Sequence, residues 1–385
     1  MRIAVLTSLY PSPPRPFEGV FAERRWRGMR SRGHEVTVTC PLPFAPPLAR
    51  GAWGEIGAMP RYEERDGIPV RRPRYLHFPG RARRNARAFA RRGLREVLGG
   101  PEPEVVVADY ALPAAAAAPE LRERRIPCLV NGRGSDVLEV GGEAGLAGEL
   151  GDYLEAAGSW CAVSDDLVGA MDRLAGAPGR GRLVPNGVDL ERFVPGDRSA
   201  ARRELGLADG RLVVVCGHLI PRKDPRLALE AFRRGAGATD RLVYLGRGPL
   251  RDELRGAIDE AGLGERVELR GEVPPEELAT WYRAADLLLL TSRREGRPNV
   301  VLEALASGCP VLATEAGGTA EVLGPFAARS LATSRDPEGL GQRLAALLDD
   351  PPSPEALRAS VEPLSWERSF QALEAALAEA VERAR

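Results

Sequence analysis

Short apolar runs alternate with segments of helical periodicity along the whole chain. In the first half, runs of strand length occur at residues 3–6, 35–39, 105–108, 128–130 and 161–164. In the second half, one run ends at Cys216, and others occupy residues 267–270, 287–290 and 310–314. Segments between them, such as 20–32 and 275–284, have the spacing of helices with one buried face. The alternation predicts an α/β fold of doubly wound, mainly parallel sheets.

One strand–loop–helix–strand unit, residues 287–314, concentrates the candidate chemistry. Four leucines form its first strand, Pro298 suits the first helical position, and Gly308 with Pro310 ends the helix. The helix N-terminus should therefore lie at the carboxyl end of a sheet, where open α/β sheets bind ligands. Unpaired amides and the helix dipole make that end attractive to phosphate.

Two glutamates flank this helix start. Glu295 precedes the helix, and Glu303 lies five residues past Pro298, roughly 7.5 Å along the axis at about 1.5 Å per residue. Carboxylates do not bind an anion. They can, however, accept hydrogen bonds from hydroxyl groups that flank an anionic group in a ligand. A sugar joined through diphosphate to a ribose has that pattern of groups. The alternative is a surface helix whose glutamates form salt bridges.

The amino-acid composition limits the classes of protein to which the chain can belong. At 385 residues the chain is long enough for two domains, and its 54 basic and 54 acidic residues do not suggest a nucleic-acid binder. The five cysteines are far apart and include no C-x-x-C pair, which disfavours disulfides and zinc and favours a reducing cytoplasm. The first apolar run is too short for a signal peptide, and no run reaches the roughly 18–20 apolar residues of a membrane span.

One compositional bias singles out a candidate residue. Lys223 is the only lysine among the 54 basic residues. Lysine and arginine differ in size and in how they meet phosphate, so a lysine that persists against this bias has a physical reason to be there. We therefore expect Lys223 to bind phosphate, the alternative being a surface lysine at a helix start.

The segment E-G-R-P-N-V-V-L-E, residues 295–303, resembles the signature of retaining glycosyltransferases of family 4, in which two glutamates are separated by seven residues. The flanking A-x-G-x-P-V and the Gly317, Gly318 pair strengthen the resemblance. It implies a GT-B fold of two facing Rossmann-like domains with a cleft between them. It also implies that Glu295 contacts the donor sugar and Glu303 the ribose hydroxyls. The diphosphate would meet the backbone around Gly296, Arg297, Pro298, Asn299 and Val300.

The same resemblance extends to the glycine-rich loops. Lys223 stands where the family has its phosphate-binding lysine, and Gly217 and His218 precede it, His218 in the place of a usual arginine. Gly19 matches a glycine that meets the donor phosphate, although it also suits a helix start for geometric reasons alone. Gly271 is expected near the nucleotide base.

The first domain should bind the acceptor. The segment N-G-R-G-S-D-V carries Arg133 where family members often have a histidine near the reacting sugar. Because arginine is permanently charged, Arg133 would hold an anionic acceptor or the diphosphate and could not act as a base. Asp136 is expected to cap the next helix or to orient an acceptor hydroxyl.

The resemblance covers nearly the whole chain and suggests the domain limits. We expect an N-terminal acceptor-side domain at residues 1–195, completed by a crossing C-terminal helix at 365–385. A nucleotide-sugar-binding domain would occupy residues 200–360, after a linker at about 195–200.

Ten arginines lie between Arg71 and Arg95 with few apolar residues. A basic helical stretch of this kind can bind anionic lipid headgroups at a membrane surface. Two alternatives are a solvated helix face and contact with an anionic acceptor.

These features together predict a cytoplasmic retaining hexosyltransferase, peripheral at the inner face of the cell membrane. Its donor would be UDP- or GDP-linked, and its acceptor a saccharide or lipid-linked precursor of the cell envelope or an exopolysaccharide. No metal cluster is apparent in the sequence, so neither a metal nor another cofactor is expected. Alternatives on the same fold are a nucleotide-sugar epimerase or a sugar phosphorylase, and a further one is a non-enzymatic membrane-surface scaffold.

Overall fold

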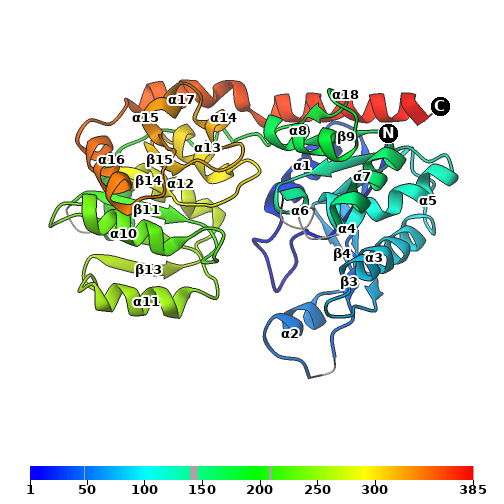
Figure 1. The fold of residues 1–385 in the computed structure, drawn as a ribbon, viewed down its shortest axis with the longest axis horizontal. Coiled ribbons are helices and arrows are strands. Elements are labelled where there is room, and N and C mark those ends of the chain that lie inside the picture. Colours follow the sequence, from blue (N-terminus) through cyan, green and yellow to red (C-terminus); the bar gives the residue numbers. More distant parts are fainter. Residues whose placement is uncertain (47, 139–145, 208–209, 385) are drawn as a thin grey trace. The chain divides into compact units, whose positions relative to one another are not determined.

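The computed structural model describes residues 1–46, 48–138, 146–207 and 210–384. The chain divides into two compact units. The first unit comprises Met1–Asn186 together with Trp366–Arg385, and the second comprises Gly187–Ser365 (Figure 1).

The first unit is built on an eight-stranded sheet. In order across the sheet, the strands are β10 (Arg182–Leu183), β9 (Trp160–Ala162), β8 (Cys128–Gly132), β7 (Val105–Asp109), β1 (Arg2–Thr7), β2 (Glu35–Thr39), β5 (Ile68–Arg71) and β4 (Tyr62–Arg65). Neighbouring strands pair in parallel, except that β4 runs antiparallel to β5. The central strands β7 and β8 are buried along their whole length, because helices cover both faces of the sheet. Two short strands, β3 (Leu42–Pro43) and β6 (Arg74–Tyr75), pair in parallel as a separate small sheet.

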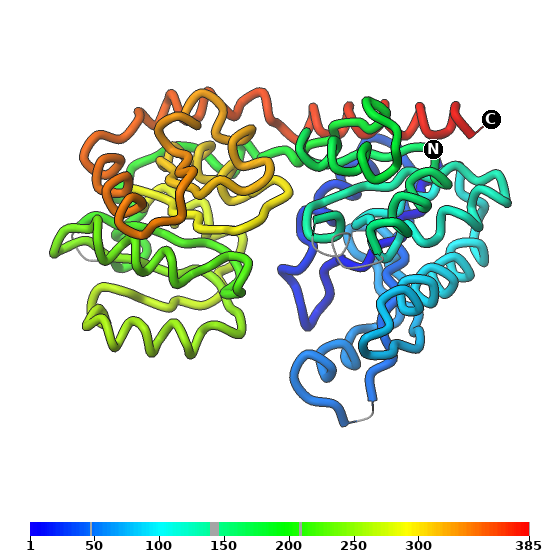
Figure 2. The backbone as a smooth tube through the Cα atoms, viewed as in Figure 1, coloured from blue at the N-terminus to red at the C-terminus, as the bar shows by residue number. Residues whose placement is uncertain are grey.

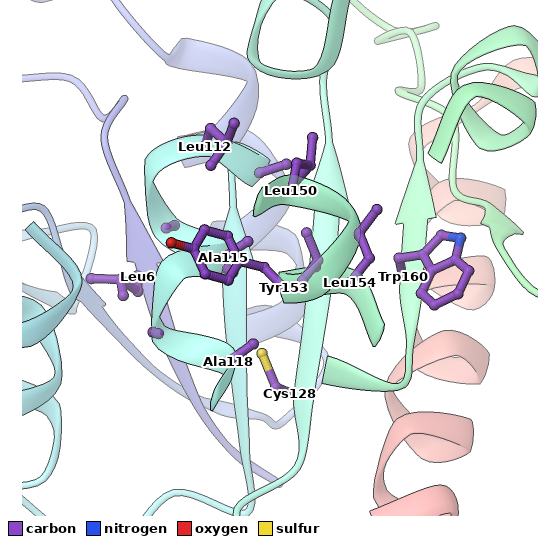
Figure 3. Close-up of a cluster of buried hydrophobic side chains, with 14 of the residues drawn as sticks. Leu6, Leu112, Ala115, Ala118, Cys128, Leu150, Tyr153, Leu154 and Trp160 are labelled. Carbon is purple, nitrogen blue, oxygen red and sulfur yellow. The ribbon is translucent and has the colours of Figure 1, made fainter. Parts of the chain in front are cut away.

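Ten helical segments belong to the described part of the first unit. They are α1 (Val20–Ser31), α2 (Gly51–Ala58), α3 (Ala82–Val97), α4 (Ala111–Ala114), η1 (Ala115–Ala117), α5 (Ala118–Glu123), α6 (Ser135–Leu138), α7 (Leu146–Ala157), α8 (Asp165–Leu174) and α18 (Trp366–Ala384). The alanine-rich segment of α4, η1 and α5 packs closely against α7, as Figure 3 shows for Ala115, Ala118, Tyr153 and Leu154. Small side chains permit this close approach.

The C-terminal helix α18 completes the core of the first unit. Leu373 and Leu377 join Trp26 and Met29 of α1 in one buried cluster. Gly28 allows the contact, because a Cβ there would lie 1.9 Å from the ring of Phe370. Arg32 adds hydrogen bonds to the carboxylates of two α18 residues, Glu367 and Glu374. Arg385, the last residue of the helix expected from the sequence, lies outside the described residues.

The second unit has a six-stranded parallel sheet. Its strands, in order, are β13 (Val267–Gly271), β12 (Arg241–Leu245), β11 (Leu212–Cys216), β14 (Leu287–Leu290), β15 (Val311–Thr314) and β16 (Leu331–Ala332). The chain builds outward from β11 to β13 and then crosses to β14 on the other side of β11. The carboxyl ends of β11 and β14 therefore flank a topological switch point, the usual ligand site of an open α/β sheet.

Helices cover both faces of this sheet. Two clusters of buried apolar side chains form the core of this unit. They are α9 (Arg198–Glu204), α10 (Pro225–Gly235), α11 (Arg251–Glu260), α12 (Pro275–Ala284), α13 (Asn299–Ala306), α14 (Thr319–Leu323), η2 (Gly324–Phe326), α15 (Ala327–Ser330), α16 (Pro337–Asp349), α17 (Pro354–Val361) and η3 (Glu362–Leu364).

Three details differ from the sequence prediction. Residues 187–195, expected to close the first domain, belong to the second unit, where Val188 and Phe193 are buried in the core. Pro298 is the N-cap of α13 and not its first residue. The basic stretch is only partly helical, because it begins in β5 and β6, and Arg72 is buried where it pairs with Glu63.

Candidate active site

The centre of the candidate site is an ion pair between two neighbouring strand ends of the second unit. Lys223 lies in the loop that follows β11, and Glu295 in the loop that follows β14, the strand paired with β11. Nζ of Lys223 donates a hydrogen bond to Oε1 of Glu295. Two residues separated by 72 positions in the sequence thus meet at the switch point.

The loop that carries Lys223 is fixed by hydrogen bonds to the loop of Glu295. Asp224 has a positive φ of 47°, and Oγ1 of Thr291 donates to the carbonyls of both Lys223 and Asp224. Arg335 ties the two loops together through the Asp224 carboxylate at 2.7 Å and the Thr291 carbonyl at 2.9 Å. Such a network holds the lysine in position before any ligand arrives.

Glu295 is ionised in this environment. Its side chain is buried, which alone would raise its pKa, but the charge of Lys223 and the hydrogen bond from its ammonium lower the pKa below its ordinary value. Arg222 adds a second cation, with Nη1 3.6 Å from Oε2. A carboxylate so held can accept hydrogen bonds from sugar hydroxyls.

The second glutamate of the signature is held by a tyrosine. Glu303 lies on α13 and is only 7% exposed, and the hydroxyl of Tyr282 on α12 donates to its Oε2 at 3.3 Å. The same phenol also interacts with the thiol of Cys216 at the end of β11. Burial, with the nearby thiol and carboxylate, raises the pKa of Tyr282 well above its ordinary value, so it remains a hydrogen-bond donor.

The start of α13 lies between these two glutamates in the sequence. Pro298 caps the helix without a side-chain hydrogen bond, and its carbonyl accepts from the amide of Val301 at 3.1 Å. The positive end of the helix dipole lies here. Gly296 accepts a hydrogen bond from the amide of Gly318 at 3.1 Å. These contacts place the G-x-P-N segment beside the Gly317, Gly318 turn.

Arg297 is a buried arginine within this segment. Its side chain is 4% exposed, and Nη1 lies 3.5 Å from Oε2 of Glu321 on α14. The pair joins the signature loop to α14, so it orients the segment whose backbone we expected to meet the diphosphate.

Glycines at the ends of β11 and β13 show why small residues are needed there. Gly217 has a φ of 140°, and a Cβ there would make only ordinary van der Waals contact, 3.7 Å from Cε of Lys223, so its backbone conformation is what favours glycine. Gly271 has a φ of 93°, but a Cβ there would meet open space, so its backbone conformation and not crowding requires glycine. His218 is exposed in the loop that carries Lys223.

In the first unit, Gly19 sits at the equivalent switch point, after β1 and at the start of α1. Its φ is 78°, and a Cβ would lie 3.0 Å from the backbone of Leu9 and Tyr10. Both the conformation and the close backbone approach therefore require glycine.

Arg133 is engaged with a buried aspartate. Nε and Nη2 of Arg133 contact the two oxygens of Asp109 at 2.7 and 2.9 Å. Trp26 and Asn131 donate to the same carboxylate at 2.8 and 2.7 Å. Burial would raise the pKa of Asp109, but Arg133 and the other donors hold it below its usual range. This geometry favours Arg133 as the support of Asp109 over the expected role of binding an anion.

Asp136 uses its carboxylate to hold the backbone. It accepts hydrogen bonds from the amides of Ala111, Arg133 and Gly134 at 2.5, 3.0 and 2.7 Å. Burial outweighs these bonds and raises its pKa to about 6. The expected cap of the next helix is not seen, because Asp136 lies inside α6 and its partners are two preceding amides and the first amide of α4. Contact with an acceptor hydroxyl stays a prediction.

Sequence reasoning missed the residues that position these groups. Tyr282 and Arg335 gave no signal because their partners lie 21 or more residues away in the sequence. Asp109 could have been found, since it is a carboxylate at the end of a buried strand. The structure offers no group of three or more His, Cys, Asp or Glu residues that could hold a metal ion within its described ranges.

Comparison with known proteins gives the family. The family description "Glycosyltransferase Family 4" matches residues 19–192, and "Glycosyl transferases group 1" matches residues 197–362. The Bacillus subtilis glycosyltransferase TuaC, whose name assigns it to teichuronic acid biosynthesis, is 33% identical over 342 residues, which cover 84% of this chain and 83% of TuaC. This chain belongs to glycosyltransferase family 4.

Other relatives of this glycosyltransferase match shorter stretches. A D-inositol 3-phosphate glycosyltransferase of Nocardia farcinica is 40% identical over 179 residues, which cover 44% of this chain and 40% of that protein. Such relatives agree with the family assignment, although the chain spans less than half of this one.

Solved structures show the fold of the glycosyltransferase. Sucrose-phosphate synthase from Thermosynechococcus elongatus matches with a TM-score of 0.81 at 20% identity over all of both chains. Anabaena HepE, solved with UDP and glucose, matches with a TM-score of 0.77 at 18% identity over 98% of this chain and all of that one. The expected GT-B class, with two Rossmann-like domains, is thereby confirmed.

No helix in the described ranges is both long and apolar enough to cross a bilayer.

Proposed function

We propose that this glycosyltransferase moves a hexose, with retention of configuration, from a UDP- or GDP-linked donor to a saccharide or lipid-linked acceptor. The observation that carries the proposal is the contact of Lys223 with Glu295 at the switch point of the second unit. The contact supports the proposal because an ammonium is a group that binds phosphate, and a carboxylate is a group that accepts hydrogen bonds from sugar hydroxyls.

Each group of the second unit has a role in this proposal. Glu295 accepts hydrogen bonds from the donor sugar, and Glu303 accepts them from the ribose. Lys223 and the first amides of α13 neutralise the diphosphate, which gains charge as the sugar departs. When the donor binds, the ammonium of Lys223 lies between the carboxylate and the phosphate and serves both.

The proposed reaction needs no nucleophile from the protein. The bond between the anomeric carbon and the diphosphate oxygen breaks and leaves an oxocarbenium-like sugar. The acceptor hydroxyl attacks on the face from which the diphosphate leaves, and the departing phosphate oxygen takes its proton. Retention follows because bond breaking and bond making use the same face. We assign no metal and no other cofactor to this sequence of steps.

The acceptor is proposed from the relatives and from the charge of the first unit. TuaC is named for the synthesis of a cell-envelope polymer, and the similarity extends over most of both chains. A precursor of such a polymer carried on a lipid would bring a cytoplasmic enzyme to the inner face of the cell membrane. The arginines of α3 suit that surface.

A donor screen tests the proposal. The protein is incubated with UDP- and GDP-linked hexoses in EDTA, and released nucleotide is measured with saccharide acceptors. We expect release with donors of one base, and a loss of about 100-fold in the rate for Lys223→Ala, as for other removed transition-state donors. Arg226→Ala, an exposed cation at the start of α10, is the matched control and should keep the wild-type rate.

Two results would overturn the proposal. One is the absence of nucleotide release with every donor, and the other is a Lys223→Ala variant as active as the control. Retention is checked separately by the anomeric configuration of the product, which NMR reads directly, and a product of inverted configuration would exclude it.

A further inference from the structure

The exposed apolar side chains of the protein gather on one projection of the first unit. Of the seven large apolar side chains that the described residues expose, six lie between residues 44 and 78. We define the apolar tip as five of these, Phe44, Leu48, Trp53, Leu76 and Phe78, which are 54%, 98%, 40%, 68% and 36% exposed. Figure 2 shows the loop of β3 and α2 projecting from the rest of this unit.

Contacts between its segments hold the apolar tip together. The amide of Phe44 donates to the carbonyl of Tyr75 at 2.9 Å, which extends the β3–β6 pairing to both segments. The ring of Trp53 on α2 lies 6.1 Å from the ring of His77, beside Leu76 and Phe78. The tip is therefore one folded surface.

Arginines border this apolar surface. The guanidinium of Arg84 stacks 4.1 Å from the ring of Phe78. Arg81, the N-cap of α3, lies between these two residues in the sequence. Arg50 precedes α2 and is exposed. The acidic Glu55 on α2 is paired with Arg15 at 2.9 Å. Aromatic and aliphatic side chains edged by cations are the composition of surfaces that lie in a bilayer interface.

A cavity connects the tip to the sheet of the first unit. It has a volume of about 320 Å³, and its lining includes Tyr75, His77 and Asn85 at the base of the tip. It also includes Ser8 and Tyr110, which directly follow β1 and β7, so it opens at the switch point of this unit. Tyr110 has a φ of 76°, a strained conformation of the kind that gathers at ligand sites.

We propose that the apolar tip and its bordering arginines dock the first unit on an anionic lipid bilayer, with Trp53 at the level of the headgroups. The cavity then receives the sugar end of a lipid-linked acceptor from that surface. This second step rests on the proposed function, whereas the docking does not depend on it.

Trp53 gives the docking a built-in reporter. The other four tryptophans, Trp26, Trp160, Trp281 and Trp366, all lie in described ranges and are no more than 8% exposed. A blue shift of the emission on addition of vesicles therefore reports on Trp53. The expected shift requires phosphatidylglycerol in the vesicles, and phosphatidylcholine alone should give much less.

Sedimentation of the full chain with the same vesicles measures the affinity. We expect Leu76→Ser to weaken binding on the order of tenfold, because the variant loses the favourable transfer of the leucine side chain from water into the bilayer. Arg81→Ala and Arg84→Ala should each weaken it about fivefold, the usual effect of one cation near an anionic surface. Leu183→Ser, on the edge strand β10, and Arg255→Ala, on α11, are the matched controls and should bind as wild type.

The outcomes separate docking from catalysis. Thermal melts of all variants are compared first, so that loss of binding is read only from folded protein. No binding to anionic vesicles, or equal binding by tip and control variants, overturns the docking. Self-association that the tip variants abolish, without vesicle binding, assigns the surface to a second copy and also overturns it. Nucleotide release with a soluble acceptor, measured without vesicles, tests the proposed function independently of all these results.

Discussion

At the scale of single residues, the candidate site depends on carboxylates that are held by other side chains. Glu295 is fixed by Lys223, and Glu303 by Tyr282. A buried carboxylate with one oxygen held can offer the other to a hydroxyl in a set direction. The positions of these partners, and not the glutamates alone, decide how a ribose or a sugar could bind.

Tyr282→Phe tests whether the tyrosine positions Glu303. The variant loses one hydrogen bond to a buried carboxylate, and we expect UDP or GDP, whichever binds, to bind roughly three- to tenfold more weakly. A nucleotide without the 2′ and 3′ hydroxyls should show no difference between variant and wild type. Tyr244→Phe, which removes a buried hydroxyl bonded to Pro225, is the control. Equal weakening with both nucleotides would mean that Tyr282 is merely structural.

The sequence identified some of these residues and not others, for a physical reason. Lys223 stood out because it is the only lysine, and Glu295 and Glu303 because their spacing surrounds a helix start. Arg133 was visible too, but its neighbour Asp109 belongs to a different strand. Such a pairing depends on the order of strands in the sheet, which local sequence patterns do not specify. The sequence alone therefore predicts that Arg133 binds an anionic ligand.

At the scale of elements, strands and helices followed the apolar pattern closely. The four leucines at 287–290 form β14, and the helix 275–284 is α12. The limit between the domains was less predictable. Residues 187–195 look like a loop in the sequence. The burial of Val188 and Phe193 in the second core, with hydrogen bonds from Arg358 to this segment, joins them to that unit.

The docking of α18 on α1 should depend on pH. Hydrogen bonds from Arg32, with His34 adding to them, lower the pKa of Glu374 to about 2, below the ordinary value of 4.5. Because the folded-state pKa is depressed, this stabilisation is present above about pH 4.5 and is lost as the pH falls toward 2. Glu374→Gln should lower the melting temperature at pH 7 by about 2–4 °C.

The difference between wild type and Glu374→Gln should shrink as the pH is lowered through that window. Differential scanning calorimetry from pH 7 to pH 2 measures it. Glu382→Gln, exposed near the end of the same helix, is the control and should melt as wild type at every pH. A difference that stays constant with pH would exclude the ion pairs as its cause.

At the scale of the whole molecule, each unit brings a different part of the chemistry to the carboxyl edge of its own sheet. The second unit carries Lys223, the two glutamates and the start of α13. The first unit carries Gly19, the cavity after β1 and β7, and the apolar tip. The expected donor contacts thus lie mainly in the second unit, and the first unit adds Gly19, expected near the donor phosphate, to the cavity proposed for the acceptor.

Calorimetric titration of UDP and GDP into wild type and Glu303→Ala tests the central claim most directly. We expect one nucleotide to bind wild type and to bind the variant at least about tenfold more weakly, because the hydrogen bonds from the ribose to a charged group are lost. Glu260→Ala, an exposed carboxylate at the end of α11, should bind as wild type. Binding of neither nucleotide to wild type, or an unchanged affinity in Glu303→Ala, would contradict the account.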